Sequence, residues 1–461
     1  MTAAGSDTEG DRSVAEQPMA DRRSLGRNYW LLWVSSAVSN FGDGVGIIAY
    51  AWLASTLTRN PLLIAGVAVA SRLPWLLFTL PAGVLTDRYD RRRLVVAMDA
   101  LRAVITFGVA VVVFATGGDL PDPDALADGS AAAPANGAVA LAGLYVATLL
   151  LGSAEVLRDN SAQTLMPRLV AAEDLERANG RLWSVELMMN SFIGPPVAGF
   201  ILATSLSVPF FIDATTFAVA ALLLAGIQGA FAANARGSVA PSPAGERQPM
   251  RAEIGEGVRW LWSHDLIRSL AIALGIINGV MALSTATLVL LAQEVLGLDA
   301  TGFGILTTSG AIGGLVGSLS GSKVSTRLGP GTALLATILV IGATALAVLL
   351  LPVFVVVFAA TALSMFFGMV WNIITVALRQ TLIPDELLGR VNSVYRMLGW
   401  GAMPIGTLLG GGIIALADVW LQRDDALLAP YGAGFVICVG CWVWARPRLN
   451  TAMIERAKAA G

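Results

Sequence analysis

The stretch Gly83-Val-Leu-Thr-Asp-Arg-Tyr-Asp-Arg-Arg-Arg-Leu94 decides how this chain folds. Apolar runs long enough to cross a bilayer flank it on both sides, so the polar segment must be a short turn at a membrane face. Its four arginines place that face inside the cell, because positive residues are retained on the cytoplasmic side. The stretch therefore predicts a multi-pass membrane protein, in which it serves at least as a topological anchor.

The composition also indicates a membrane protein. Of the 461 residues, 56% are hydrophobic and 13% are charged, whereas a soluble chain has about 25% charged residues. The net charge of −2 and the lack of a basic face argue against a nucleic-acid partner. His264 is the sole histidine, which excludes a multi-histidine metal site, and Cys438 and Cys441 lie in an apolar run where packing is the expected role.

About twelve apolar segments reach the ~20 residues that a spanning helix needs, which predicts an all-α integral membrane protein. Basic residues such as Arg168 and Lys323 collect in alternate loops, while the loop 117–137, which belongs to the other set, is acidic. This alternation places both termini in the cytoplasm. The expected spans are 28–56, 61–85, 93–116, 138–165, 176–204, 208–232, 268–296, 300–325, 331–351, 353–380, 388–417 and 427–446.

The chain divides into five parts by composition. Residues 1–26 are polar without an apolar core, which is typical of a disordered tail and not of a cleavable signal peptide. Polar residues at 233–250 begin a linker, and the pattern after them predicts an amphipathic helix on the inner membrane surface. The expected parts are a cytoplasmic tail (1–26), an N-terminal six-helix bundle (27–232), a cytoplasmic linker with the amphipathic helix (233–267), a C-terminal six-helix bundle (268–446) and a cytoplasmic tail (447–461).

The two halves are internal repeats. Gln163-Thr-Leu-Met-Pro167 recurs as Gln380-Thr-Leu-Ile-Pro384, and Asp87-Arg-Tyr-Asp90 lies over Thr326-Arg-Leu-Gly329 once an insertion near 117–137 is allowed. A parallel repeat of six helices, joined by a long inner linker, is expected of a transporter whose two bundles rock about a site near the midplane.

The stretch Gly83–Leu94 resembles the loop 2–3 signature of the major facilitator superfamily, Gly-x-x-x-Asp-Arg-x-Gly-Arg-Arg/Lys, with Asp90 in place of the usual glycine. Residues Leu157–Glu186 and Leu388–Gly411 resemble, more narrowly, the enterobactin-exporter and macrolide-efflux branch. The resemblance covers roughly residues 28–446. It implies the major facilitator fold in a bacterial plasma (cytoplasmic) membrane and does not indicate the substrate.

Ionisable side chains inside spans are costly in lipid, so each is a candidate for transport chemistry. Asp43 lies ~15 residues into the first span, or ~22 Å deep, which is near the middle of the bilayer. It sits among glycines in the segment Ser39–Gly46. Asp43 could accept a proton or bind a cationic substrate, and a hydrogen bond to a neighbouring helix is the alternative.

The fourth and fifth spans carry a second group of ionisable residues. Glu155, Arg158 and Asp159 share one helical face, and Glu186 of the antiparallel fifth span lies at a similar depth. Two carboxylates near one arginine suit proton exchange, although a static ion-pair network is an equal alternative. The residues expected to serve as structural anchors are Asp99 and Arg102, which could also join this network, and Asp213.

Residues Asn190–Gly199 resemble the Gly-Pro-x-x-Gly-Gly antiporter signature, with Ala198 replacing the first glycine of the closing pair. This partial match favours export over uptake. A glycine next to prolines permits a bend or close packing, so the expected hinge comprises Gly194, Pro195, Pro196 and Gly199. The remaining candidates for lining the substrate site are Asn190, Trp371 and Asn372, for which ordinary packing is the alternative.

The second-half counterpart of the opening stretch, Thr326–Gly331, lacks both aspartates and most of the arginines. A pure anchor would be needed in both halves, so we expect the first-half loop to act as a cytoplasmic latch. Asp87 should contact the start of the eleventh span around Gly389–Arg396, where a helix N-terminus favours an anion. The expected gate residues are Gly83, Asp87, Arg88, Arg91, Arg92 and Arg396, with Arg379 as a further gate partner.

The chain has no Gly-x-x-x-x-Gly-Lys-Ser/Thr segment, so an ion gradient and not ATP is the expected energy source. The main hypothesis is a monomeric, proton-coupled exporter of small organic molecules such as drugs or a siderophore, with no enzymatic activity and no cofactor. The alternatives are a proton symporter that imports a nutrient and a non-transporting membrane receptor or scaffold. Buried carboxylates disfavour the scaffold.

Overall fold

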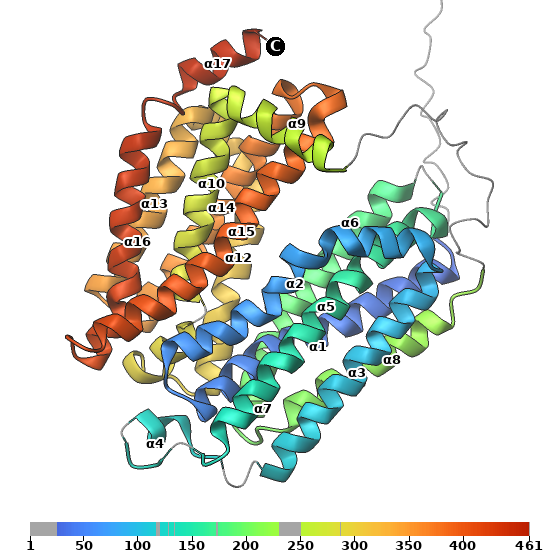
Figure 1. The fold of residues 1–461 in the computed structure, drawn as a ribbon, viewed down its shortest axis with the longest axis vertical. Helices are drawn as coiled ribbons and strands as arrows, with labels where there is room; N and C mark the ends of the chain where they lie inside the picture. The colour runs from blue at the N-terminus through green and yellow to red at the C-terminus, as the bar shows by residue number, and fades with distance from the viewer. Residues whose placement is uncertain are drawn as a thin grey trace, which may run out of the picture.

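The computed structural model describes residues 25–116, 120–127, 129–132, 134–171, 174–229, 250–285 and 287–460. Within these residues the regular structure is helical, and twelve helical segments are long and apolar enough to cross a membrane. The segments form two bundles that lie side by side (Figure 1). The twelve-span, two-bundle prediction is therefore confirmed.

The N-terminal bundle, or N half, has one interrupted span. In its fifth span α6 (Leu175–Leu187) passes through the π-helical turn η3 (Met188–Ile193) into α7 (Gly194–Leu202). The other spans are α1 (Arg27–Leu57), α2 (Pro61–Arg88), α3 (Arg91–Thr116), α5 (Gly137–Leu169) and α8 (Val208–Ala225), and α4 (Pro123–Ala127) is a short helix between α3 and α5.

The C-terminal bundle, or C half, has the spans α10 (Asp265–Thr285), α12 (Ala300–Leu328), α13 (Pro330–Leu350), α14 (Phe354–Leu382), α15 (Asp385–Ala417) and α16 (Arg423–Ala445). Its non-spanning elements are α9 (Met250–Ser263), α11 (Leu288–Leu290), the π-helical turn η4 (Leu291–Val295) and α17 (Thr451–Ala460). Cys438 and Cys441 are free and buried in the C-half core, which confirms their packing role.

Side-chain caps fix where several spans begin. Asn60 accepts a hydrogen bond from the backbone N–H of Leu62 at the start of α2, and Asp299 caps α12 in the same way. Asp90 accepts the Arg93 N–H at 3.0 Å. An N-terminal cap contributes about 1 kcal/mol to a helix, so Asp90, which stands where the resembled signature has glycine, stabilises the start of α3.

The two bundles share a core at one end of the molecule and have separate cores at the other. We call the end that carries α4 the α4 face, and the end with the start of α1, α9 and α17 the terminal face (Figure 1). One apolar cluster joins both halves and includes Phe210 of α8 and Phe303 of α12. The other two clusters belong to single halves, around Tyr29 and around Trp371. The halves therefore pack together at the α4 face.

One expectation about the C half was wrong. The segment 268–296 is not one helix, because α10 ends at Thr285. The backbone at Thr287 is non-helical, with φ −102° and ψ 6°. It lies in a group of serine and threonine residues, which favour helix ends because their side chains compete for nearby backbone groups. The residues after 447 hold the helix α17, which is capped by Asn450 and docks with Ile454 buried.

The predicted amphipathic helix is present as α9, but it packs on protein. Leu261 is fully buried, and a Cβ at Gly257 would lie 2.9 Å from the carbonyl oxygen of Arg390 on α15. Glu256 forms an ion pair with Arg390. Much of the predicted linker, 230–249, and the N-terminal tail before residue 25 lie outside the described residues.

Candidate functional site

Asp43 and Arg102 form an ion pair between α1 and α3 inside the N half. Arg102 also donates a hydrogen bond to Ser39 Oγ at 3.3 Å, and its guanidinium lies 3.8 Å from the ring centroid of Phe217. The Asp43 side chain is 23% exposed, whereas that of Arg102 is buried. Asp43 is therefore the more exposed end of a buried pair.

Asp99 extends this pair into a network. Its side chain is fully buried, and Oδ1 lies 3.6 Å from Arg102 Nη1 and 3.6 Å from Arg158 Nε. Arg158 in turn pairs with Asp159 at 3.1 Å and donates to Ser36 Oγ at 3.4 Å. We call Asp43, Asp99, Arg102, Arg158 and Asp159 the N-half charge network. It joins α1, α3 and α5 across the centre of the bundle.

Three more carboxylates surround the network. Glu155 and Glu186 are half-buried and Asp213 is buried, and none of them has a cation within 4.0 Å among the described residues. Asp213 lies against α1, where a Cβ at Gly42 would be 2.5 Å from its Oδ1. The carboxylates therefore outnumber the arginines in this part of the N half.

Arg158 does not form the expected ion pair with Glu155 and Glu186. Its partners are Asp99 on α3 and its sequence neighbour Asp159. Glu155 lies near Asp43, Arg72 and Arg102 instead, and Glu186 lies near Arg158 and Asp159 without contact at ion-pair distance. The reason is the rotation of α3, which turns Asp99 toward Arg158.

The predicted hinge residues lie at close contacts between helices. A Cβ at Gly194 would be 2.7 Å from Gly44 Cα, and one at Gly199 would be 2.4 Å from the Ala300 carbonyl oxygen of the C half. Pro195 and Pro196 lie in the first turn of α7, which follows η3 directly. Asn190 contacts Gly44 through its backbone carbonyl. The segment is thus the place where the fifth span touches both α1 and the other half.

The C-half candidates divide between core and surface. Trp371 is buried in the apolar core of the C half, which fits the packing alternative, while Asn372 is exposed. Arg379 donates to Asn392 and lies 4.1 Å from the Tyr395 ring. Its guanidinium is thus engaged within the C half and makes no contact with the first-half loop among the described side chains.

The described arginines of the predicted latch contact their own bundle. Arg91 donates to Thr164 O of α5 at 3.4 Å, and Arg92 donates to Ala225 O of α8. Arg396 lies over the Trp400 ring at 5.2 Å. The side chains at Gly83, Asp87 and Arg88 lie outside the described ones, so the contact of Asp87 with 389–396 stays a prediction.

A second charge cluster, which the sequence analysis did not predict, joins the halves at the α4 face. Glu294 of η4 is 6% exposed and pairs with Arg59, from the turn between α1 and α2, and with Arg423 Nε at 2.7 Å. We call Arg59, Glu294 and Arg423 the clasp. The sequence held one signal of it. Arg59 and Arg423 are the basic residues of the loops expected to face the outside of the cell, where basic residues are rare.

Further bonds strengthen the clasp. Arg423 donates to the Arg59 carbonyl oxygen at 2.7 Å, and it pairs with Asp418 of its own half at 2.9 Å. Gln293 accepts from Arg59 at 2.7 Å and donates to Ser55 Oγ at 3.0 Å. Polar groups of the two halves therefore bond to one another at the α4 face.

The contact between α2 and α15 loosens from the α4 face toward the terminal face. A Cβ at Gly411 would lie 2.9 Å from the Pro61 carbonyl oxygen, and one at Gly401 would lie 3.8 Å from Leu76. Met397, one turn of α15 nearer the terminal face than Gly401, is 52% exposed. The facing helices thus diverge toward the terminal face.

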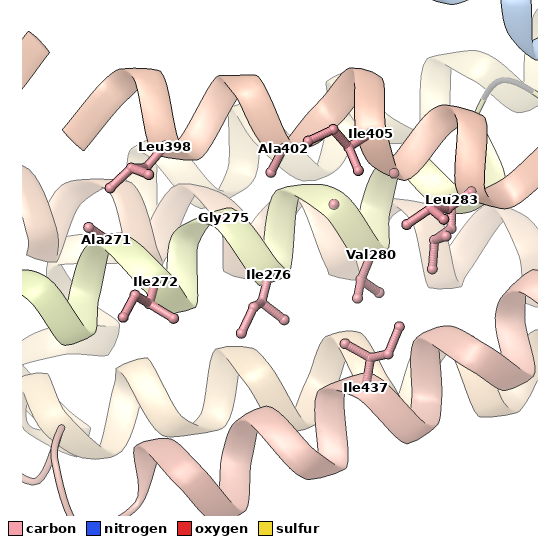
Figure 2. A pocket seen from close by; sticks show the side chains of 13 residues that line it. Ala271, Ile272, Gly275, Ile276, Val280, Leu283, Leu398, Ala402, Ile405 and Ile437 are labelled. Carbon is pink, nitrogen blue, oxygen red and sulfur yellow. The ribbon is translucent and has the colours of Figure 1, made fainter. Parts of the chain in front are cut away.

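An apolar groove lies apart from these charged groups. It is lined by side chains of α10 and α15 with Ile437 of α16 (Figure 2). All of its lining residues are apolar. The groove therefore has no group for ion coupling or polar recognition.

Comparison with known proteins agrees with this architecture. A family model described as Major Facilitator Superfamily matches residues 32–407. The multidrug efflux pump Tap of Mycobacterium tuberculosis (strain ATCC 25618 / H37Rv) is 27% identical over 393 residues, which cover 83% of this chain and 86% of Tap.

Two further proteins are similar at lower identity. The enterobactin exporter EntS of Escherichia coli O1:K1 / APEC is 24% identical over 337 residues, with 72% of each chain covered. The crystal structure of a bacterial homologue of the iron transporter ferroportin, in its inward-facing state, superposes with a TM-score of 0.63 at 18% identity and covers 91% of this chain and all of that chain. That last similarity shows the fold.

Proposed function

This chain belongs to the major facilitator superfamily, and on that premise we propose that it is a proton-coupled exporter of small organic molecules that works by alternating access. Its coarse function follows from the family and its relatives: it is a multi-pass membrane transporter and not an enzyme. The N-half charge network carries the finer proposal, because ionisable side chains inside spans are costly in lipid and mark ion and proton pathways.

The carboxylates of the N half are the proposed proton carriers. The ion pairs of the network and the unpaired Glu155, Glu186 and Asp213 hold more acids than arginines. A surplus negative charge in low dielectric is best relieved by proton binding. Asp43 is the proposed entry group, since it is partly exposed while its partner Arg102 is buried.

The proposed conformation is open to the cytoplasm. The positive-inside rule assigns the terminal face, with its arginine-rich turn between α2 and α3, to the cytoplasmic side. The clasp and the shared core close the α4 face, and α2 and α15 diverge toward the terminal face. Substrate would enter between the halves from the cytoplasm and leave when the clasp opens.

Export is preferred to uptake because two relatives bear the names of exporters, Tap for multiple drugs and EntS for enterobactin. Gly194 and Pro195, which resemble part of the antiporter signature, lie where the fifth span contacts both α1 and the C half. Small organic molecules, protons and the lipid bilayer are thus the proposed partners, and the transporting unit is proposed to be the monomer.

Dye flux in proteoliposomes separates the proposal from its alternatives. An antiporter accumulates ethidium or calcein when the vesicle interior is acidic, because outward proton flow drives dye inward. A symporter accumulates dye only when the exterior is acidic, and a receptor gives no flux above protein-free vesicles. Asp43→Asn and Glu155→Gln should remove the response to the gradient. Flux that ignores the gradient in the wild type would refute proton coupling.

A further inference from the structure

Arg72 is a cation in the middle of the second span that no described partner neutralises. It lies inside the apolar window of α2, 11 residues after the first residue, Pro61. That separation corresponds to a depth of ~16 Å at ~1.5 Å per residue. The side chain is exposed and forms no hydrogen bond or ion pair with another described residue. An arginine at this depth is costly unless it lines a polar space.

The phase of the helix shows that Arg72 faces the C half. Residues at spacings of four, seven and eleven lie on one helical face. Pro61, Ala65 and Leu76 have these spacings from Arg72, and all three contact α15, at Gly411 or at Gly401. A neighbouring side of α2, about 100° round the helix from Arg72, packs on α5, where a Cβ at Gly152 would lie 2.3 Å from the Ser71 carbonyl oxygen.

The space in front of Arg72 is accessible. Leu76, one turn nearer the terminal face, is 46% exposed although it points toward Gly401 of α15. The contact between α2 and α15 is tight at Gly411 and loose at Gly401. Arg72 is therefore at the depth where the halves begin to separate, and its guanidinium faces the space between them.

Glu155 of α5 is a charged residue near Arg72. The two interact electrostatically across α2 and α5, yet they do not come within ion-pair distance. Gly152, one turn before Glu155, allows α5 to pack close to α2. Glu155 thus offsets part of the arginine charge and leaves the planar donor face of the guanidinium unoccupied.

We propose that Arg72 binds an anionic oxygen group of the transported molecule, such as a carboxylate, so that organic anions are the substrate class. A guanidinium presents paired N–H donors that match two oxygens of one group, and this geometry is stronger than a point charge. The proposal rests on the proposed transport function, because it assigns the ligand of the same space between the halves.

Two dyes on one ring system test the charge preference. Fluorescein is anionic, and a rhodamine methyl ester is a cation on the same xanthene ring. Binding of each dye to the purified full-length chain is measured by fluorescence anisotropy. Arg72→Gln should weaken fluorescein binding about 10- to 100-fold, the usual effect of losing charged hydrogen bonds. Arg72→Lys should lose less, and rhodamine binding should be unchanged or stronger.

The matched control is Arg259→Gln, which removes an exposed arginine of α9 and should leave fluorescein binding at the wild-type level. Thermal unfolding of each variant checks that it is folded. The proposal is overturned if the wild type does not bind fluorescein, or if Arg72→Gln binds fluorescein as tightly as the wild type does. It is also overturned if the wild type prefers the rhodamine and Glu155→Gln weakens rhodamine binding. Fluorescein binding without proton-coupled flux would instead refute the transport function and keep the anion site.

Discussion

The N-half charge network and the clasp use the same two chemical groups to join different bodies. The network links α1, α3 and α5 within one bundle, through Asp43, Arg102 and their partners. The clasp links the N half to the C half, through Arg59, Glu294 and Arg423. The network remains intact when the halves move as rigid bodies, whereas the clasp must break.

This difference separates stability from conformational equilibrium. Removing a charge from the network leaves its partner buried and unpaired in every state of the transporter. Removing a charge from the clasp penalises only the state that is closed at the α4 face. Substitutions in the two clusters should therefore give different readouts, although both delete an ion pair.

The largest expected effect is that of Arg102→Met. It leaves Asp43 and Asp99 without this cation in the interior, and breaking a buried pair costs about 3–5 kcal/mol. The purified variant should unfold at a markedly lower temperature in detergent. Adding Asp43→Asn should restore part of the loss, because it removes the stranded charge. Equal unfolding temperatures for wild type and Arg102→Met would contradict the network.

Glu294→Gln is expected to shift the transporter toward the state open at the α4 face. It removes the acid that both clasp arginines share, and charged hydrogen bonds contribute about 1.5–3 kcal/mol each. The ratio of open to closed molecules should rise about 10- to 100-fold. The readout is the maleimide labelling rate of a cysteine at Ala65, which is buried, with Cys438 and Cys441 replaced.

Asp418→Asn is the matched control for the clasp. Asp418 pairs with the same arginine, Arg423, but both belong to the C half. Its loss should leave the labelling rate near the wild-type value, since no bond between the halves changes. If Asp418→Asn opened the α4 face as far as Glu294→Gln, the clasp would not act between the halves.

Gly199→Ala tests whether close packing acts with the clasp. The added Cβ would lie 2.4 Å from the Ala300 carbonyl oxygen, so the halves must separate slightly at the α4 face. The labelling rate of the cysteine placed at Ala65 should rise, but less than it does with Glu294→Gln. No charge changes in this variant. Gly143→Ala, where nothing lies within 4 Å, should leave labelling unchanged.

The smallest effect is expected at His264, which belongs to neither cluster. Burial lowers the pKa of His264 below its ordinary value of 6.5. The neutral ring stacks on Trp260 and accepts the Ile267 N–H. A lowered pKa means that folding favours the neutral form, so stability present above pH 6.5 falls as the pH drops toward the folded-state pKa. The unfolding temperature of His264→Gln should depend less on pH than that of the wild type in the range just below pH 6.5. An unaltered pH dependence would exclude this contribution.

The spans could be predicted because hydrophobic length and loop charge are local properties of the sequence. The depth of Asp43 and of Glu155 followed from counting residues along a helix. Their partners did not, because pairing depends on how each helix is rotated about its axis. That rotation turns Asp99 toward Arg158, a partner that spacing along α5 alone could not indicate.

The clasp and Arg72 were missed for a related reason. Arg59, Glu294 and Arg423 are distant in sequence and meet only because the halves close at one face. Arg72 is a single charge in an apolar window, and its direction became clear only from the contacts of Leu76 and Ala65 with α15. Local patterns predict elements, whereas sites built between elements require their packing.

The two π-helical turns hold spare chain at the joint between the halves. A π-turn contains about one residue more than an α-turn. The turn η3 leads into Gly199, which touches the C half, and η4 carries Glu294 of the clasp. Passing that residue along the helix would twist the helical segment beyond the turn by about 100° and lengthen it by about 1.5 Å. Each half therefore has an extra helical residue at the contact between the halves, and it can shift that residue without unfolding a span.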